Sequence, residues 1–316
     1  MSQYPPMKSL LTAAVAVLGA LALGPASADS RSVDTAYGPI TIESEPERVV
    51  TLYEGALDPT LAVGANAVGA VITRGGNDVA EYIKPLAGDI TIVGAPAETN
   101  IEAVIAARPD IILAPAQTNQ QQYQLLSRIA PVVVSNVLMF QPDSWEQETR
   151  LYARALGREQ AGETAIEEVH TRIAEIAALV EQLVPEDQRD ATLVRWMPQG
   201  PLVMAEGLFS ATLLQAVGFE VNANGLVSEG RPHSQPLSLE NLARMDQNWV
   251  FLATLNADGQ EALEAARQTP AFNRLKANGQ DRVIAVNGQL WTSATGPLAA
   301  KAILDDIEAA LATLAP

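Results

Sequence analysis

One short passage occurs twice in the chain, and it constrains the fold more than any other feature. The first copy spans residues 100–114 and the second spans residues 238–252. In each copy a residue that favours the N-cap stands two positions before a glutamate, and an Asp or Asn eight positions after the glutamate opens an all-apolar stretch. This pattern predicts a capped helix that leads into a buried parallel strand. The repeat therefore predicts two similar α/β lobes, each with one glutamate, Glu102 or Glu240, at a helix start.

The first 28 residues have the pattern of a secretory signal peptide. Lys8 gives a positive start, an apolar run rich in Ala and Leu covers residues 10–23, and Ala26-Ser27-Ala28 is an A-x-A cleavage site before Asp29. The apolar run is too short for a membrane span and lacks a stop-transfer pattern. We therefore expect an exported chain that is cleaved after residue 28.

Cysteine content and charge exclude several classes of protein. The 316 residues contain no cysteine, which excludes a disulfide framework, an Fe–S cluster, a thiolate zinc site and a lipidated cysteine after the cleavage site. The formal net charge of −17 argues against nucleic acid, anionic membranes and a highly anionic ligand held by the overall field, although the same acidity suits a salt-rich habitat. These features predict a free, monomeric protein of a bacterial periplasm.

A long amphipathic helix divides the mature chain. Apolar residues recur at three- and four-residue intervals from Ile166 to Leu183, and Pro185 ends the pattern. We expect this helix, residues 158–185, to link an N-terminal α/β lobe at residues 29–157 to a C-terminal α/β lobe at residues 186–316.

Short apolar segments alternate with helical spacers on both sides of the linking helix, after an opening hairpin at residues 32–43. The predicted strands are residues 48–53, 67–73, 90–93, 110–114 and 131–135 in the first lobe, and 191–196, 201–205, 219–222, 248–253 and 282–286 in the second. A last helix is predicted at residues 297–314. Strands that alternate with helices predict a mostly parallel sheet in each lobe, with binding residues in the loops after the strand ends.

Neither catalysis nor metal binding by the protein itself finds support in the sequence. The two histidines are far apart, and we expect His170 to lie on the face of the linking helix. Two separate histidines without thiols cannot form an ordinary zinc site. The sequence also lacks G-x-S-x-G, P-loop and H-E-x-x-H motifs. We therefore predict a protein that is not an enzyme and has no metal site of its own.

Polar and aromatic residues gather at the predicted strand ends. Arginine offers a planar fork for carboxylate, hydroxamate or catecholate oxygens, and Tyr and Trp give flat apolar walls. The predicted ligand-binding residues are Tyr53, Arg74, Gln117, Arg195, Trp196, His233 and Trp291. Other roles stay open at this point: internal salt bridges for the arginines, core packing for Trp196, and iron ligation by the Tyr53 phenolate.

Several segments resemble the periplasmic substrate-binding proteins of iron-siderophore, haem and vitamin B12 importers, above all the iron-siderophore branch that includes ferric-citrate binders. The resemblance covers essentially the mature chain. It rests on residues 47–52, 67–70, 100–102, 108–112 and 238–240, together with the single long helix between the lobes.

The resemblance implies a protein without a cofactor that binds an Fe(III)-siderophore complex and delivers it to an ABC transporter permease dimer. It also implies a role for the repeated glutamates. Glu102 and Glu240 match the family's glutamates, one in each lobe, that meet arginines on the two permease halves. An acid in a first helical turn is also favoured by the helix dipole alone.

Three functional hypotheses follow. The first is capture of a ferric siderophore, with arginines and aromatic residues around the chelator. The second is the same scaffold with haem or a cobalamin as ligand, and haem would need Tyr53 or His233 as an axial ligand. The third is a secreted α/β enzyme that uses Glu54 as a general base.

We predict that the mature protein begins near Asp29, because the A-x-A sequence precedes that residue and no cysteine follows it. N-terminal sequencing of the exported protein tests this. Recovery of residues 1–28 on a membrane-bound form would contradict it.

Overall fold

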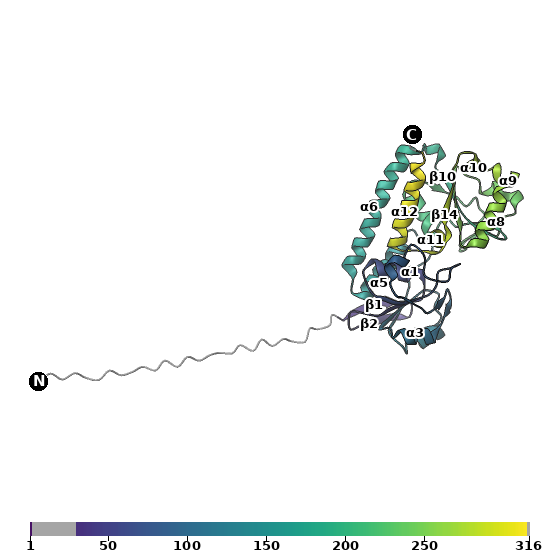
Figure 1. The fold of residues 1–316 in the computed structure, drawn as a ribbon. Coiled ribbons are helices and arrows are strands. Elements are labelled where there is room, and N and C mark those ends of the chain that lie inside the picture. Colours follow the sequence, from purple (N-terminus) through teal and green to yellow (C-terminus); the bar gives the residue numbers. More distant parts are fainter. Residues whose placement is uncertain (2–29, 315–316) are drawn as a thin grey trace.

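The computed structural model describes Met1 and residues 30–314, so residues 2–28 of the predicted signal peptide lie outside the described residues. Figure 1 shows two lobes, each with its own sheet, and two long helices that run side by side along the C-terminal lobe. The predicted α/β fold with two lobes is confirmed. The boundaries of the domains stay predictions.

The N-terminal lobe is built on a five-stranded parallel sheet with the order β5-β4-β3-β8-β9. An antiparallel hairpin, β1 and β2, opens the lobe, and a two-residue pair, β6 and β7, follows β5. The strands are β1 Arg31–Thr35, β2 Gly38–Ile42, β3 Val49–Thr51, β4 Ala67–Ala70, β5 Thr91–Ile92, β6 Gly94–Ala95, β7 Glu98–Thr99, β8 Ile111–Ala114 and β9 Val132–Val134. The helices are α1 Glu54–Ala62, α2 Lys84–Ala87, α3 Ile101–Ala107, α4 Gln120–Leu126 and α5 Ser144–Leu156.

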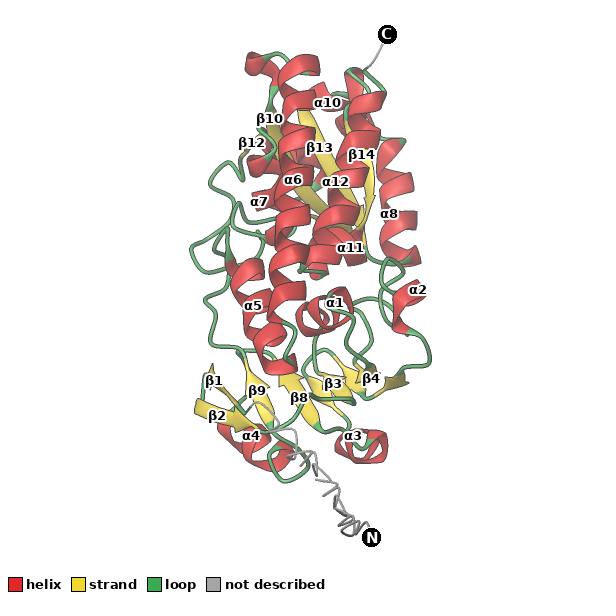
Figure 2. Ribbon diagram, turned by 90° about the vertical axis from the view of Figure 1, so that its left-hand side faces the viewer, coloured by secondary structure: helices red, strands yellow, loops and turns green. Residues whose placement is uncertain are grey.

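Both faces of this sheet are covered, which explains why its strands are apolar without alternation. Figure 2 shows α1 and α5 on one face and α3 and α4 on the other. Ile111 and Leu113 of β8 pack with Tyr152 of α5 on the first face. Ile112 of the same strand packs with Leu126 of α4 on the second. Successive residues of one strand therefore serve two separate cores.

The C-terminal lobe has a mixed sheet with the order β11-β10-β13-β14, in which only β11 is antiparallel, and β12 also pairs with β10. Its strands are β10 Asp190–Met197, β11 Gly200–Val203, β12 Glu220–Val221, β13 Trp249–Thr254 and β14 Val283–Asn287. Its helices are α7 Phe209–Ala216, α8 Ala257–Arg267, α9 Pro270–Asn273, α10 Lys276–Gly279, α11 Gly288–Ser293 and α12 Pro297–Ala312, with the 3-10 helices η1 Glu186–Gln188 and η2 Leu239–Met245.

The linking helix is α6, which runs over 25 residues from Glu159 to Leu183. At 1.5 Å per residue it is roughly 40 Å long. Ile166, Val169 and Ile176 are buried on its apolar face and belong to the core of the C-terminal lobe together with residues of α12. The predicted single inter-lobe helix is confirmed. Over the described residues, no helix has the length and apolar character that a membrane crossing requires.

The two copies of the repeat fold differently at their helical ends. In the first copy the Asn100 side chain accepts a hydrogen bond from the Ala103 N–H at 3.0 Å, and a capped α-helix follows, as predicted. In the second copy the helix is the 3-10 helix η2, and the Ser238 hydroxyl accepts from the Asn241 side chain instead of capping the backbone. The prediction of a capped α-helix is therefore wrong for the second copy. Both copies lead into interior strands of their sheets, β8 and β13, as predicted.

Candidate functional site

The loops after the parallel strands of the two lobes touch one another. Thr73–Gly76 follows β4 in the N-terminal lobe, and Leu255 follows β13 in the C-terminal lobe. A Cβ atom built on Gly75, whose φ is +77°, would lie 3.0 Å from the Leu255 Cβ, and one on Gly76 would lie 3.0 Å from Nε2 of Gln289. We call this contact zone, with the strand-end residues around it, the interlobe boundary.

Arg195 lies at the interlobe boundary near the end of β10. Its side chain is buried, with 8% of the residue exposed. Nε donates to Oγ1 of Thr292 at 2.8 Å, and Nη2 donates to the Thr292 carbonyl at 2.6 Å. No carboxylate within residues 30–314 forms an ion pair with it. Burial lowers the pKa of Arg195 to about 10, and the positive charge of Arg74 contributes to this shift.

Arg74 belongs to the other lobe and is exposed, and it lies close enough for its charge to act on Arg195. Its backbone N–H donates to Oε1 of Glu54 at 3.2 Å, so Glu54 holds the loop that carries it. In the described part of the chain its guanidinium also has no ion pair. The salt bridges considered for Arg74 and Arg195 are therefore not formed. Guanidinium groups without an ion pair have the chemistry to bind an anion, although the Glu54 carboxylate also lies near Arg74.

Glu54 gives the boundary a polar character on the N-terminal side. Burial raises the pKa of its carboxyl group, and Thr73 and Arg74 beside it offset this only in part. Among the described residues, Oε2 of Glu54 and Oγ1 of Thr73 are buried atoms without a hydrogen-bond partner of good geometry. Ser293, next to the residue that holds Arg195, has an unpartnered buried hydroxyl oxygen as well. Buried polar atoms of this kind are costly unless a ligand or water satisfies them.

Tyr53 follows β3 and stands at the N-cap position of α1. Its hydroxyl donates to Oε1 of Glu148 at 2.5 Å and lies 2.7 Å from the Tyr152 hydroxyl. Burial raises the pKa of Tyr53 well above its ordinary value, and the nearby Tyr152 and Glu148 raise it further. Tyr53 is therefore a neutral phenol engaged within its own lobe, which opposes a role as an iron phenolate ligand.

The two tryptophans predicted as ligand walls are core residues in this structure. Trp196 is 2% exposed and packs edge-on against Phe272, with ring centroids 5.9 Å apart. Trp291 is 1% exposed, stacks on Phe251 at 5.2 Å, and donates its indole N–H to Asp306 at 2.7 Å. Neighbouring residues of a strand point to opposite faces of the sheet. Because of this, Trp196 belongs to the α8–α9 core although Arg195 beside it reaches the interlobe boundary.

Gln117 and His233 lie in loops, and among the described residues neither is hydrogen-bonded to Arg74 or Arg195. Gln117 is exposed after β8, and its side chain contacts the sulfur of Met139. His233 is half-buried, and its Nδ1 lies 2.8 Å from the Ser234 carbonyl oxygen.

Leu138, beside Met139, is 75% exposed, and Met139 itself is 51% exposed. These two apolar side chains were missed in the sequence, where nothing marks an exposed Leu-Met pair as different from a core pair.

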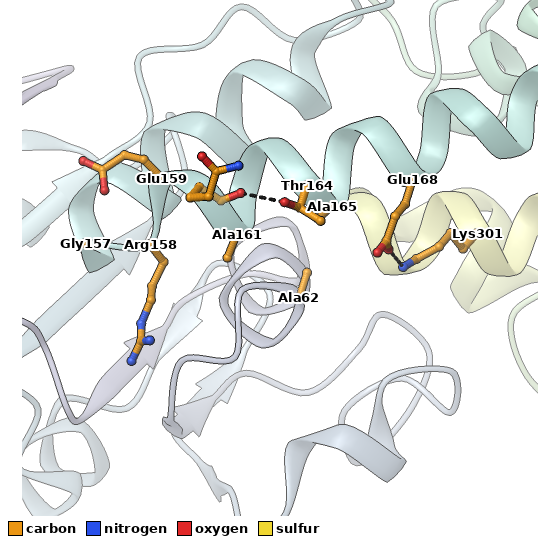
Figure 3. Close-up of a pocket in the computed structure, with 10 residues that line it drawn as sticks. Ala62, Gly157, Arg158, Glu159, Ala161, Thr164, Ala165, Glu168 and Lys301 are labelled. Atoms are coloured by element: carbon orange, nitrogen blue, oxygen red, sulfur yellow. Dashed lines mark hydrogen bonds and ion pairs between the residues drawn. The ribbon is translucent and has the colours of Figure 1, made fainter.

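A large hollow lies away from the arginine pair. It measures about 660 Å³ and lies where α5 meets α6, between Ala62 at the end of α1 and Lys301 of α12 (Figure 3). Ala62 is the last residue of α1 and Glu54 the first, so the nine-residue helix separates hollow and site by roughly 12 Å. Its two cations are already paired, Arg158 with Glu45 and Lys301 with Glu168. Within the described residues, the hollow therefore lacks the unpaired positive charge that distinguishes the interlobe boundary.

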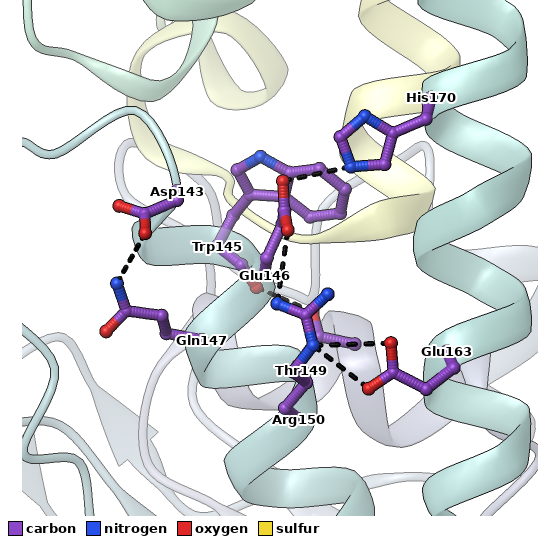
Figure 4. Close-up of polar contacts among 8 residues, drawn as sticks. All are labelled: Asp143, Trp145, Glu146, Gln147, Thr149, Arg150, Glu163 and His170. Atoms are coloured by element: carbon purple, nitrogen blue, oxygen red, sulfur yellow. Dashed lines mark hydrogen bonds and ion pairs between the residues drawn. The ribbon is translucent and has the colours of Figure 1, made fainter.

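His170 belongs to a polar network that joins α5 to α6. Its Nε2 lies 3.0 Å from Oε1 of Glu146, and Arg150 bridges Glu146 and Glu163 (Figure 4). The predicted place of His170 on the face of the linking helix is confirmed. Among the residues that the structure describes, no three His, Cys, Asp or Glu side chains are grouped as metal ligands.

Asp58 of α1 is a fully buried carboxylate at the same boundary. It accepts hydrogen bonds from the N–H groups of Leu298 at 2.9 Å and Ala299 at 2.8 Å, and from the Tyr82 hydroxyl at 3.0 Å. Burial raises the pKa of Asp58 to about 7, although these donors and Lys301 act to lower it.

Residues 49–290 match the family described as periplasmic binding protein. The chain belongs to this family. It is 27% identical over 291 residues to the "probable siderophore-binding lipoprotein YfiY" of Bacillus subtilis, with 89% of this chain and 88% of the relative covered. It is 25% identical over 273 residues to the Fe(3+)-citrate-binding protein YfmC of the same organism, with 85% and 82% covered.

A solved structure gives the same picture. The structure of Staphylococcus aureus SirA complexed with staphyloferrin B superposes with a TM-score of 0.77 at 25% identity, and covers 89% of this chain and 98% of that one. The resemblance inferred from the sequence is confirmed. These relatives are ligand-binding proteins rather than enzymes, so the hypothesis of a secreted enzyme that uses Glu54 finds no support.

The buried Asp58 predicts a specific dependence of stability on pH. Because its pKa in the folded state is about 7 and its ordinary value is 3.8, the folded protein binds more protons than the unfolded chain between these values. The stabilising contribution is complete below about pH 4 and is lost as the pH rises through about 7. We therefore expect the unfolding free energy of Asp58→Asn to fall less steeply than that of the wild type between about pH 4 and about pH 7.

Urea unfolding of both proteins at several pH values between about 4 and about 7.5 measures this effect. Asp246→Asn is the matched control, because Asp246 also accepts from two successive N–H groups at a helix start but is only partly buried. Parallel pH profiles for the wild type and Asp58→Asn would contradict the prediction.

Proposed function

We propose that this protein captures a ferric siderophore of the ferric-citrate type between its lobes and delivers it to an ABC permease. The observation that carries the proposal is the pair of arginines, Arg74 and Arg195, which come from different lobes, lie close enough for the charge of Arg74 to act on Arg195, and form no ion pair in the described chain. The mature chain would act as a monomer in a bacterial periplasm, with lobes at residues 29–157 and 186–316 joined by residues 158–185.

Electrostatics support an anionic ligand despite the acidic chain. The formal net charge of −17 repels anions at long range, so attraction has to come from the local site. Arg195 is largely removed from water, where a charged partner interacts more strongly than at the surface. A ligand carboxylate between Arg74 and Arg195 would also relieve the repulsion between the two guanidinium groups. The fork of Arg195 is already fixed by Thr292, so little ordering remains to be done on binding.

The chemistry of the side chains suits iron that stays wrapped in its chelator. Tyr53 is a neutral phenol bonded to Glu148, and the ring nitrogen Nδ1 of His233 lies against a backbone carbonyl. The Tyr53 phenol is therefore already engaged, whereas the contact at Nδ1 leaves Nε2 of His233 as the ring nitrogen that could ligate haem iron. A siderophore brings its own oxygen donors, and the protein has only to bind the organic shell. Haem and cobalamin serve as the alternative ligands in the test.

We predict that Arg74→Ala and Arg195→Ala each weaken the binding of ferric citrate roughly ten- to a hundred-fold. Each charge-assisted contact contributes ~1.5–3 kcal/mol, which corresponds to that range. Tryptophan fluorescence titration measures the affinity. Arg195→Lys keeps the charge but loses the planar fork, and we expect an intermediate affinity.

Arg274→Ala, an exposed arginine beyond α9, is the control for the loss of one positive charge and should leave binding unchanged. If both site variants bind as the wild type does while their melting temperatures fall, the arginines serve the fold and the ligand site lies elsewhere. Binding of haemin or cyanocobalamin, with none of ferric citrate, would contradict the proposed ligand class.

We further propose that Glu102 and Glu240 dock the protein onto the two halves of the permease. Both are exposed, in the first turns of α3 and η2. Each has an exposed aliphatic residue close by: Ile105, one turn along α3, is 53% exposed, and Leu239 is 42% exposed. Stabilisation of a helix start requires only the acid. An exposed aliphatic side chain beside the acid is explained better by a surface that binds another protein.

The double variant Glu102→Arg with Glu240→Arg should bind ferric citrate normally and lose permease-stimulated ATP hydrolysis. Exposed charge pairs act mainly through encounter and orientation, and each is worth ~1 kcal/mol or less. The reversed charges would instead repel the arginines of the permease. The control pair is Glu159→Arg with Glu186→Arg, two acids in first turns outside the repeat. If the variant Glu102→Arg with Glu240→Arg transports normally, the repeated glutamates only stabilise the starts of their helices and do not dock the protein.

A further inference from the structure

The helix α12 of the C-terminal lobe is capped by a residue of the N-terminal lobe. Its first position is Pro297, which has no N–H, and the N–H of Ala300 is bonded to the Gly296 carbonyl at 2.9 Å. The two remaining free N–H groups, of Leu298 and Ala299, both donate to Asp58. The Asp58 carboxylate of α1 therefore accepts from both N–H groups in the first turn of α12 that lack a partner within the helix. It also faces the positive end of the helix dipole.

The backbone around this contact is fitted to Asp58. Gly296 has a φ of +125°, and a Cβ atom at this position would collide with the Asp58 carboxylate. No side chain of the C-terminal lobe caps α12, because the N-cap residue is this glycine. In Figure 1 the end of α12 lies directly against α1, where the two lobes meet.

The same carboxylate is connected to both arginines of the proposed binding site. On the N-terminal side, the Tyr82 hydroxyl donates to Oδ2 of Asp58, and Tyr82 belongs to the segment after β4 that carries Arg74. On the C-terminal side, α12 follows α11 after three residues, and Thr292 of α11 binds the guanidinium of Arg195. Asp58 is thus the point at which the supports of Arg74 and Arg195 meet.

We propose that Asp58 is an interlobe latch, a positioning residue that fixes the lobes at the separation at which Arg74 and Arg195 engage one ligand. This inference rests on the proposed binding function for its consequence, but its structural part is independent of the ligand. The hydrogen bonds between α1 and α12 restrict how far the two lobes can move apart, because these bonds break when the two helices separate.

The absence of cysteine makes the latch directly measurable. Single cysteines at Gln121 of α4 and Glu261 of α8, both exposed and in different lobes, accept spin labels without competing thiols. Pulsed electron paramagnetic resonance then gives the distribution of interlobe distances. Asp58→Asn replaces one acceptor oxygen with an amide that cannot accept from a helix N–H, so we expect a broader distribution than in the wild type. Asp246→Asn, which alters a cap confined to the C-terminal lobe, should leave the distribution unchanged.

The latch also predicts an effect on binding. Ferric citrate should bind Asp58→Asn about ten-fold more weakly, as expected when the competent separation falls to roughly a tenth of the population. Tyr82→Phe removes only the bond toward the Arg74 segment, so it should weaken binding while the interlobe distances stay narrow. Gly296→Ala pushes α12 away from an intact Asp58, and it should broaden the distances even if Asp58→Asn fails to fold.

The outcomes separate the two proposals. If Asp58→Asn and Gly296→Ala both keep the wild-type distances, Asp58 is a folding cap and the latch is wrong. If the distances broaden but affinity for ferric citrate does not change, the latch exists and its role in positioning the arginines is wrong. If wild-type protein does not bind ferric citrate, the proposed ligand fails, and the distance measurements still decide whether the latch exists.

Discussion

A parallel sheet places the carboxyl ends of its strands along one edge, and in this protein the loops at those edges meet across two lobes. The segment after β4 reaches Leu255 after β13, and the residues that follow β3 and end β10 lie close to this contact. Side chains that are far apart in the sequence, such as Arg74 and Arg195, are therefore brought together by the connectivity of the strands. α6 and the contact between α1 and α12 connect the two lobes that carry these side chains.

The interlobe boundary contains several polar groups that oppose folding in isolation. Arg195 is a buried cation without a carboxylate, and burial raises the pKa of both Glu54 and Asp58. Such groups cost stability, and a purely structural interface would replace them with apolar side chains. Their concentration at one place, with unpartnered oxygens on Glu54 and Thr73, is typical of a binding site that a ligand completes. Asp58 differs from the others because its oxygens are satisfied by donors from both lobes.

The sequence shows which residue types stand at the strand ends, but it does not show toward which face each side chain points. Arg195 and Trp196 were both predicted at the site because both stand at a strand end. They are adjacent, so they point to opposite faces of β10, and Trp196 packs with Phe272 instead. Trp291 was expected in a loop but lies in α11, with its ring stacked on Phe251. Asp58 drew no attention in the sequence, because an aspartate inside a helix gives no sign that the end of another helix, 240 positions later, will meet it.

The sequence by itself determined the elements: the strands of both lobes, the helix of 25 residues between them, the two glutamates at helix starts and the family resemblance. These follow from local periodicity, capping residues and the apolar character of buried strands, which short stretches of chain contain. Only the tertiary structure decided which side chains share the interlobe boundary, which tryptophans lie in the core, and that a residue of α1 caps α12. These depend on which faces of distant elements meet, and no local pattern specifies that pairing.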